Sequence, residues 1–107
     1  MEYGYTQQLW SPPRGRTLEE VRAFLQRMGL SYARGIEHTA VVRDGTGAVA
    51  ATASLEGHVI KCVAVDPDAQ GAGLTATVVT ALRQKALEQG LRRLFLYTTP
   101  ENLEKFR

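Results

Sequence analysis

The sequence predicts a single α/β domain whose mixed sheet combines an antiparallel meander with a β-α-β crossover. Three observations support this fold class. Apolar residues first recur at helical spacing near the N-terminus, a β-branched region with glycine turns follows, and a second helical pattern then separates two apolar strands. Because these two strands are joined through a helix, we expect them to lie parallel in the sheet.

Length and composition fit one small globular domain and argue against several classes of partner. The chain has 107 residues, 44% of them hydrophobic, and 13 basic against 11 acidic residues give a net charge of +2. Since the charges form no basic stripe, nucleic-acid binding is not expected. No apolar run approaches the roughly 20 residues of a membrane span, and a single cysteine is typical of a reducing compartment. We therefore expect a cytoplasmic protein that contacts no membrane.

The N-terminal part is expected to divide into an arm and the domain proper. Residues 1–16 contain two adjacent prolines and no hydrophobic period, which predicts an irregular arm before a domain over residues 17–107. Thr17 is followed three positions later by Glu20, a capping-box pattern that predicts the start of a helix. Gly29 is expected to end this helix.

The rest of the chain predicts the sheet and a second helix. Residues 39–43, 48–55 and 58–65 are rich in β-branched and small residues and are separated by glycine-containing turns, which predicts a three-strand meander. Apolar residues then recur every four positions over about 16 residues, and Gly90 is expected to terminate this helix. Residues 93–98 predict the strand that completes the crossover.

The turn before the second helix contains Gly71 and Gly73. The order of strand, glycine turn and helix N-terminus gathers free backbone N–H groups and the positive end of a helix dipole, which favours an anion site. Glycine would also let a phosphate approach without a Cβ in the way. The turn lacks the G-x-x-x-x-G-K-[ST] and G-x-G-x-x-G patterns, and a plain structural turn is the alternative. Valine at position 73 is expected to cost about 1 kcal/mol of stability or less.

The stretch "VAVDPDAQGAGLTATVV" resembles the acyl-CoA-binding segment of the GNAT acetyltransferase superfamily. That segment has the pattern V-x-x-x-x-Q/R-x-x-G-x-G/A between a strand and a helix. Val65, Gln70 and Gly73 match it here, Gly71 fills the small second place, and Thr75 stands where the pattern has a final Gly or Ala. The order of elements also resembles this superfamily over nearly the whole chain.

A closer resemblance is carried by "TAVVRDGTGAVAATASLEGHVIKCVAVDPDAQGAGL" and "LRRLFLYTTPEN". Both are similar to the GNAT-like N-terminal domain of the citrate lyase ligase family. The resemblance implies a GNAT-like fold whose C-terminal strands are absent from this chain, and the family's nucleotidyltransferase-like domain has no counterpart in it. Strand 93–98 would then be an exposed edge, which predicts either a homodimer through that edge or a truncated chain.

The resemblance implies acetyl-CoA, or CoA, as co-substrate, with no metal. The pantetheine arm would lie between splayed strands 58–65 and 93–98, and the pyrophosphate would bind the amides of residues 70–75. The implied cofactor-binding residues are Val63, Val65, Gln70, Gly71, Ala72, Gly73, Leu74, Thr75 and Asn102. For Asn102, capping of a last helix is an equal alternative.

Catalytic residues are not identified by the resemblance. The superfamily's usual general acid is a Tyr in the helix after the second splayed strand, and Phe106 stands about there. The candidates that remain are Glu56, His58 and Tyr97, whose alternative readings are a hairpin flank for His58 and a strand aromatic for Tyr97. Cys62 invites a nucleophile interpretation but better fits a buried small hydrophobic residue.

Three functions follow as hypotheses. The first is an acetyltransferase-like protein that binds acetyl-CoA and transfers an acyl group to an amine or to a carrier thiol. The second is a non-catalytic module that binds CoA or the phosphopantetheine arm of an acyl-carrier protein. The third is a structural domain with an ordinary glycine turn. An intact glycine turn argues against the third, and the missing acid and base favour the second over a fully competent enzyme.

Overall fold

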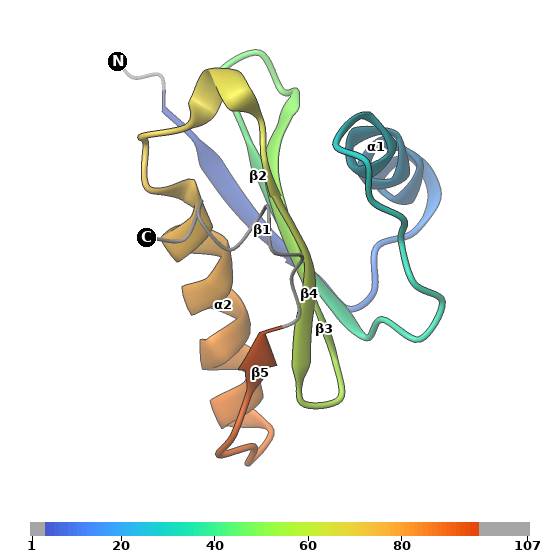
Figure 1. Ribbon diagram of the computed structural model, residues 1–107, viewed down its shortest axis with the longest axis vertical. Coiled ribbons are helices and arrows are strands. Elements are labelled where there is room, and N and C mark those ends of the chain that lie inside the picture. The colour runs from blue at the N-terminus through green and yellow to red at the C-terminus, as the bar shows by residue number, and fades with distance from the viewer. Residues whose placement is uncertain (1–3, 97–107) are drawn as a thin grey trace.

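The computed structural model describes residues 4–96 as one sheet with a helix on each face (Figure 1). The helices are α1 (Gly15–Arg27) and α2 (Leu74–Glu88), with one short 3-10 helix, η1 (Pro67–Ala69). The strands, in sheet order, are β1 (Thr6–Trp10), β2 (His38–Arg43), β3 (Val49–Glu56), β4 (Val59–Val65) and β5 (Phe95–Leu96). The first four strands are antiparallel, and β5 is parallel to β4. The predicted meander, crossover and mixed sheet are therefore confirmed.

Strand β1 corrects the prediction of an irregular arm. Thr6–Trp10 pairs with β2 in antiparallel register, with Thr6 opposite Arg43 and Trp10 opposite Thr39. Four of its five residues are exposed, so the strand has almost no buried alternation that sequence patterning could detect. Its backbone hydrogen bonds to β2, rather than burial of its side chains, hold it in the sheet.

The start of α1 corrects the predicted capping box. The helix begins at Gly15 after the N-cap Arg14, no side chain caps it, and Thr17 lies inside its first turn. Glu20 does not reach back to the helix start, because its carboxylate accepts a 2.7 Å hydrogen bond from Nη2 of Arg43 on β2. This ion pair lowers the pKa of Glu20, chiefly through the hydrogen bond from Arg43. The helix ends at Arg27, and Gly29 follows in the left-handed conformation, as predicted.

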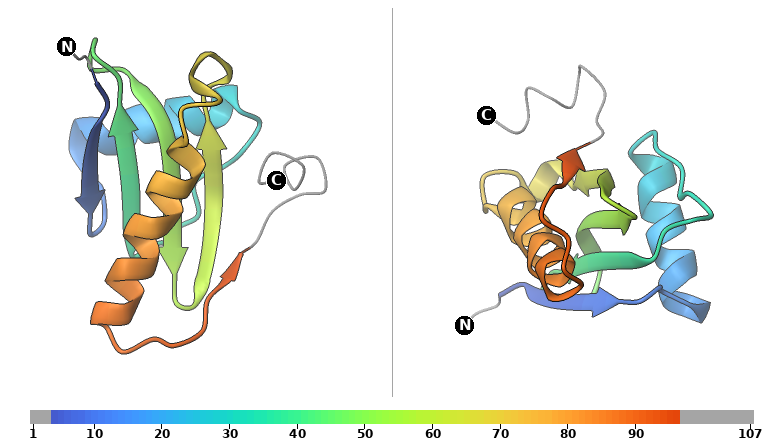
Figure 2. Two further views of the ribbon diagram at one scale, coloured as in Figure 1. Left: turned by 90° about the vertical axis from the view of Figure 1, so that its left-hand side faces the viewer. Right: turned by 90° about the horizontal axis from the view of Figure 1, so that it is seen from below.

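The helices pack on the sheet through two apolar clusters, one on each face. Val21, Phe24 and Leu25 of α1 are buried against one face, and α2 buries Val78, Leu82 and Ala86 among others against the opposite face. Figure 2 shows α2 lying across the antiparallel strands. Seven of the eight residues of β3 are buried because this central strand is covered on both faces. No helix within residues 4–96 is both long and apolar enough to cross a membrane.

Candidate functional site

The carboxyl end of β4, the glycine turn and the first turns of α2 surround a cleft of about 650 Å³. The end of α1 and β5 complete its walls. The described residues that line it are Met28, Leu30, Val63, Ala64, Val65, Ala69, Gln70, Gly71, Gly73, Leu74, Thr75, Ala76, Val79 and Leu96. None of these side chains is charged. Any anion held by this part of the cleft would be bound by backbone groups rather than by lysine or arginine.

Most of the residues implied by the GNAT resemblance meet in this cleft. Its lining contains Val63, Val65, Gln70, Gly71, Gly73, Leu74 and Thr75. Ala72 is exposed beside the cleft, and its amide is engaged with the carbonyl of Ala69 at 3.4 Å. Asn102 lies outside the described residues. The structure thus brings seven of the nine residues together, and their role as cofactor ligands stays a prediction.

The N-terminus of α2 leaves several backbone donors open. Gly73 is the N-cap, and no side chain among residues 4–96 caps the helix. The first α2 amide with an intrahelical acceptor is that of Thr77, which donates to the Gly73 carbonyl at 3.1 Å. The preceding amides, of Leu74, Thr75 and Ala76, have no acceptor within residues 4–96. Together with the positive end of the helix dipole, these donors form a region suited to an anion.

Glycine is needed in this turn because of backbone conformation. Gly71 has a φ of 92° and Gly73 a φ of 74°, both in the left-handed region. A Cβ added to either residue would meet no atom within 4 Å, so crowding is not the reason. This finding corrects the expected cost of valine at position 73. A β-branched side chain in the left-handed region costs about 1–2 kcal/mol or more, rather than 1 kcal/mol at most.

Among residues 4–96, β5 covers only the beginning of the backbone edge of β4. The described part of β5 pairs with β4 at Val59 and Ile60, opposite Phe95 and Leu96. From Lys61 onward, β4 has no β5 partner among residues 4–96. Arg93 and Leu94 of predicted strand 93–98 precede β5 without strand structure, and residues 97 and 98 lie outside the described residues. The expected separation of the two strands toward the cleft stays a prediction.

A bulge in β4 turns its side chains toward both faces of the sheet. The register with β3 shifts between Thr52 and Ser54, and Cys62 in the bulge has a φ of 55°. As a result, Ile60 and Val63 both belong to the α2-side cluster although they are three positions apart. The bulge lies immediately before the residues that line the cleft.

Cys62 points to the opposite face, toward α1. Its thiol donates to the carbonyl of Ser31 at 3.3 Å, and its side chain packs against the α1-side cluster. Burial raises the pKa of the Cys62 thiol, so it is neutral at physiological pH. The structure thus agrees with the small hydrophobic residue that the sequence suggested, because a nucleophile requires the thiolate.

The two described catalytic candidates, Glu56 and His58, do not line the cleft. Glu56 accepts a 2.9 Å hydrogen bond from Nζ of Lys61, and Nδ1 of His58 donates to the carbonyl of Arg93 at 3.2 Å. Both belong to the β3–β4 hairpin, at the opposite end of β4 from the glycine turn (Figure 1). With a rise of about 3.3 Å per residue, the two ends of this strand are some 20 Å apart. Tyr97 and Phe106 lie outside the described residues.

Sequence reasoning missed the residues that reach the cleft from distant elements. Met28 and Leu30 follow α1, Val79 lies in the second turn of α2, and Leu96 comes from β5. Two of them carried a signal, Met28 as an apolar residue at the end of the predicted first helix and Leu96 as part of predicted strand 93–98. No local pattern indicates that the chain after α1 returns to the end of β4.

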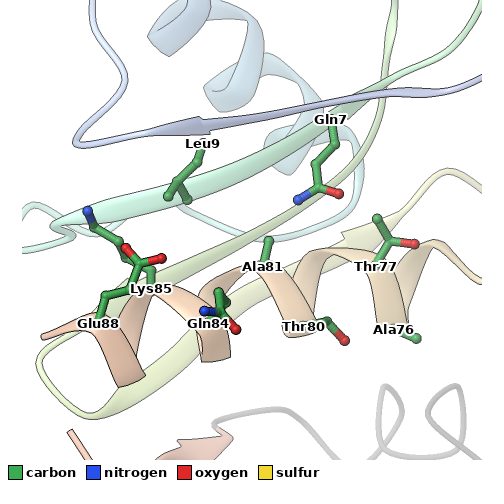
Figure 3. Close-up of a pocket in the computed structure, with 9 residues that line it drawn as sticks. All are labelled: Gln7, Leu9, Ala76, Thr77, Thr80, Ala81, Gln84, Lys85 and Glu88. Carbon is green, nitrogen blue, oxygen red and sulfur yellow. The ribbon is translucent and has the colours of Figure 1, made fainter. Parts of the chain in front are cut away.

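A second groove, of about 620 Å³, runs between β1 and the opposite flank of α2 (Figure 3). Gln7 and Leu9 point toward the helix from β1, and the helix contributes Ala76, Thr77, Thr80, Ala81, Gln84, Lys85 and Glu88. This groove was not predicted, because it depends on β1. Elsewhere in residues 4–96, no three His, Cys, Asp or Glu side chains gather as a metal-binding group.

Known proteins resemble this chain in sequence and in structure. The family model described as the acetyltransferase (GNAT) family matches residues 5–105. Over 88 residues the chain is 34% identical to citrate (pro-3S)-lyase ligase of Klebsiella pneumoniae, a match that covers 82% of this chain and 25% of the ligase. The chain thus spans about a quarter of the length of this curated relative.

Solved structures share the fold at low identity. A ribosomal-protein-alanine N-acetyltransferase from Brucella melitensis has a TM-score of 0.75 at 16% identity, over 97% of this chain and 88% of that chain. A predicted acetyltransferase from Clostridium acetobutylicum, solved with acetyl-CoA, has a TM-score of 0.74 at 9% identity, over 95% of this chain and 86% of that chain. The family match over nearly the whole chain confirms the resemblance read from the glycine turn: the chain belongs to the acetyltransferase (GNAT) family.

Proposed function

We propose that the cleft binds acetyl-CoA or CoA and that the domain is an acetyltransferase-like protein. The observation that carries this proposal is the open N-terminus of α2, where the amides of Leu74, Thr75 and Ala76 have no acceptor within residues 4–96. Because the described lining has no charged side chain, these amides and the helix dipole are the elements suited to a pyrophosphate.

The remainder of the cleft suits the pantetheine arm. The amides of the arm would pair with the backbone edge of β4 near Val63 and Val65, as an added strand does. Within residues 4–96, β5 leaves this part of the edge unpaired. Apolar side chains from both faces, including Leu30 and Val79, would cover the arm. When bound, acetyl-CoA supplies an activated thioester, and the residues of this chain hold and orient it.

The absence of a titratable side chain from the described lining favours a second candidate function. Acyl transfer to an amine needs a base for the amine and an acid for the leaving thiolate. Glu56 and His58 lie at the far end of β4, and neither lines the cleft. The alternative is therefore a non-catalytic module that binds CoA or the phosphopantetheine arm of an acyl-carrier protein. Both functions use the same CoA site and differ in turnover.

Calorimetric titration tests the site itself. CoA should bind the wild-type chain with micromolar-range affinity, about 8 kcal/mol, and adenosine, which lacks the pyrophosphate, far more weakly. Gly73→Asp should weaken CoA binding at least tenfold, or about 1.4 kcal/mol, because its carboxylate competes for the amides and repels phosphate.

Matched variants separate charge from shape. Gly73→Asn has nearly the same shape as the Asp variant without its charge, and asparagine tolerates the left-handed region, so its loss should be smaller. Gly90→Asp places the same charge at the other end of α2, where φ is 83°, and should bind CoA like the wild type. Absence of CoA binding to the wild-type chain, or equal affinity of all four proteins, would contradict the proposal.

Turnover then distinguishes the two candidate functions. A transferase should release CoA thiol from acetyl-CoA when a primary amine is added, or produce acetyl-pantetheine when pantetheine is added. A binding module should bind acetyl-CoA with the same affinity and release nothing above the protein-free rate. The two measurements together also identify the acceptor class.

A further inference from the structure

Helix α2 and strand β5 enclose another groove, of about 370 Å³, beside the cofactor cleft. Leu87, Phe95 and Leu96 line it, with 54%, 61% and 44% of their surfaces exposed. These are three of the five large hydrophobic residues that are exposed within residues 4–96. Apolar side chains concentrated in this way on a small domain mark an interaction surface.

The described rim of this groove carries one sign of charge. Arg83 of α2 and Arg92 of the loop before β5 both line it and are both exposed, and exposed Arg93 follows directly. No acidic residue of the described chain lines the groove. Glu88, the acidic residue on this end of α2, lines the groove on the opposite flank of the helix (Figure 3). An apolar floor with a cationic rim complements a segment that is apolar on one face and acidic on the other.

We propose that this groove, which we call the α2–β5 groove, docks an acidic amphipathic helix of a partner protein. A helix laid in a groove buries apolar residues spaced at i, i+3, i+4 and i+7, and acidic residues beside them would meet Arg83 and Arg92. The groove shares Val79 and Leu96 with the cofactor cleft, so the partner would lie next to bound cofactor. If the cleft binds acetyl-CoA as proposed above, a partner in this position would carry the group that accepts the acyl chain. The substrate class is then an acceptor borne by a protein.

Two other occupants fit the groove less well. A two-fold dimer would bring the same patch of two copies together, so the Arg83 and Arg92 pairs would face like charges without a described carboxylate between them. An anionic bilayer would match the charge, but its surface cannot enter a groove. The homodimer expected from the sequence stays a prediction, and its formation through this groove is one outcome that would overturn the proposal.

The test uses a synthetic helical peptide with Leu at i, i+3, i+4 and i+7 and Glu at the outer positions, labelled for fluorescence anisotropy. Controls are a peptide of the same composition in scrambled order and one with Lys in place of Glu. The acidic amphipathic peptide should bind at least about fivefold more tightly than either control, and added salt should weaken it. Peptide binding is measured with and without CoA, so that the peptide result can be interpreted even if the protein does not bind CoA.

Variants locate the peptide on the protein. Arg83→Glu and Arg92→Glu should each weaken it at least about fivefold, and Leu87→Gln similarly. Arg22→Glu, at an exposed position of α1, makes the same change of charge on the other face of the sheet. It should change peptide binding less than about twofold. Equal binding of acidic and basic peptides, no binding, or loss with Arg22→Glu alone would overturn the proposal. Arg83-dependent self-association in sedimentation, or Arg83-dependent binding to phosphatidylglycerol vesicles without peptide binding, would overturn it as well.

Discussion

The two ends of α2 share a backbone conformation and differ in what they leave open. Gly73 precedes the helix with a φ of 74°, and Gly90 follows it with a φ of 83°. At the C-terminal end the chain closes on itself: the amide of Gly90 donates to the carbonyl of Leu87 and that of Leu91 to the carbonyl of Ala86, both at 3.0 Å. At the N-terminal end no comparable bonds form within residues 4–96. A left-handed glycine therefore does not distinguish the two ends of α2, whereas the backbone donors left open within residues 4–96 do.

The surroundings of the two ends reinforce this difference. The C-terminal end is tied to the sheet, because Nε2 of Gln89 donates to Nε2 of His38 at 2.9 Å. The ring of His38 is buried, and its Nδ1 lies 2.8 Å from Oγ of Ser11, which follows β1. The N-terminal end instead borders the cleft at the carboxyl end of β4. One end anchors the helix, and the other is available to a ligand.

The largest effect is expected from a substitution that disrupts the packing of α2 on the sheet, because both ends of the helix depend on this packing. Leu82 is fully buried at the middle of the helix. Leu82→Ala should lower the free energy of unfolding by about 2–5 kcal/mol, because it leaves a cavity under the helix. Urea denaturation measures this loss, and Leu87→Ala, at an exposed position of the same helix, should cost no more than about 0.5 kcal/mol. Similar losses for both variants would contradict the described packing.

The next effect separates the two glycines. Gly73→Val and Gly90→Val should each lower stability by about 2 kcal/mol, because both force a β-branched residue into the left-handed region. CoA affinity, measured by calorimetry under conditions where both variants are folded, should fall at least tenfold for Gly73→Val alone. If Gly90→Val weakened CoA binding equally, the contrast between the open and the closed end would be wrong.

A smaller effect tests the anchor at the C-terminal end. Gln89→Ala removes the donor to Nε2 of buried His38 and should cost about 1 kcal/mol of stability. Its CoA affinity should equal that of the wild type. Gln84→Ala, five positions earlier at an exposed site of the helix, is the matched control and should leave the unfolding curve nearly unchanged. A loss of CoA binding in Gln89→Ala would show that the two ends are coupled.

The smallest effect concerns pH. Burial raises the pKa of Cys62 and of Tyr32 above their ordinary values, so the folded state disfavours ionisation of both groups. The stability they contribute is complete below their unfolded pKa values and is lost as the pH rises through the folded ones. Unfolding free energy should therefore fall on the alkaline side of about pH 9, and less steeply in Cys62→Ala.

CoA affinity should stay level between about pH 7 and 8, since no titratable side chain occurs in the described lining; a steep change there would reveal an ionising group at the site.

Local patterns predicted most of the fold and part of the site. Hydrophobic alternation and turn residues located the three meander strands within one residue of their ends, and a four-residue apolar repeat located α2. Strand β1 escaped prediction because four of its residues are exposed and only backbone pairing with β2 makes it a strand. The predicted capping box does not form, because Glu20 pairs with Arg43, which lies 23 residues further along the chain.

The sequence by itself determined where the backbone turns and which segments alternate or repeat, since dihedral preferences and periodicity act over a few neighbouring residues. Gly73 and Gly90 were both recognisable as turn positions for this reason. Only the tertiary structure decided which of them opens into a cleft, because that depends on where Met28 and Leu30 return to the end of β4. The position of Glu56 and His58 far from that cleft, by contrast, follows from the order of strand and turn along the chain. The return of Met28 and Leu30 depends on packing between residues distant in sequence, which no local pattern encodes.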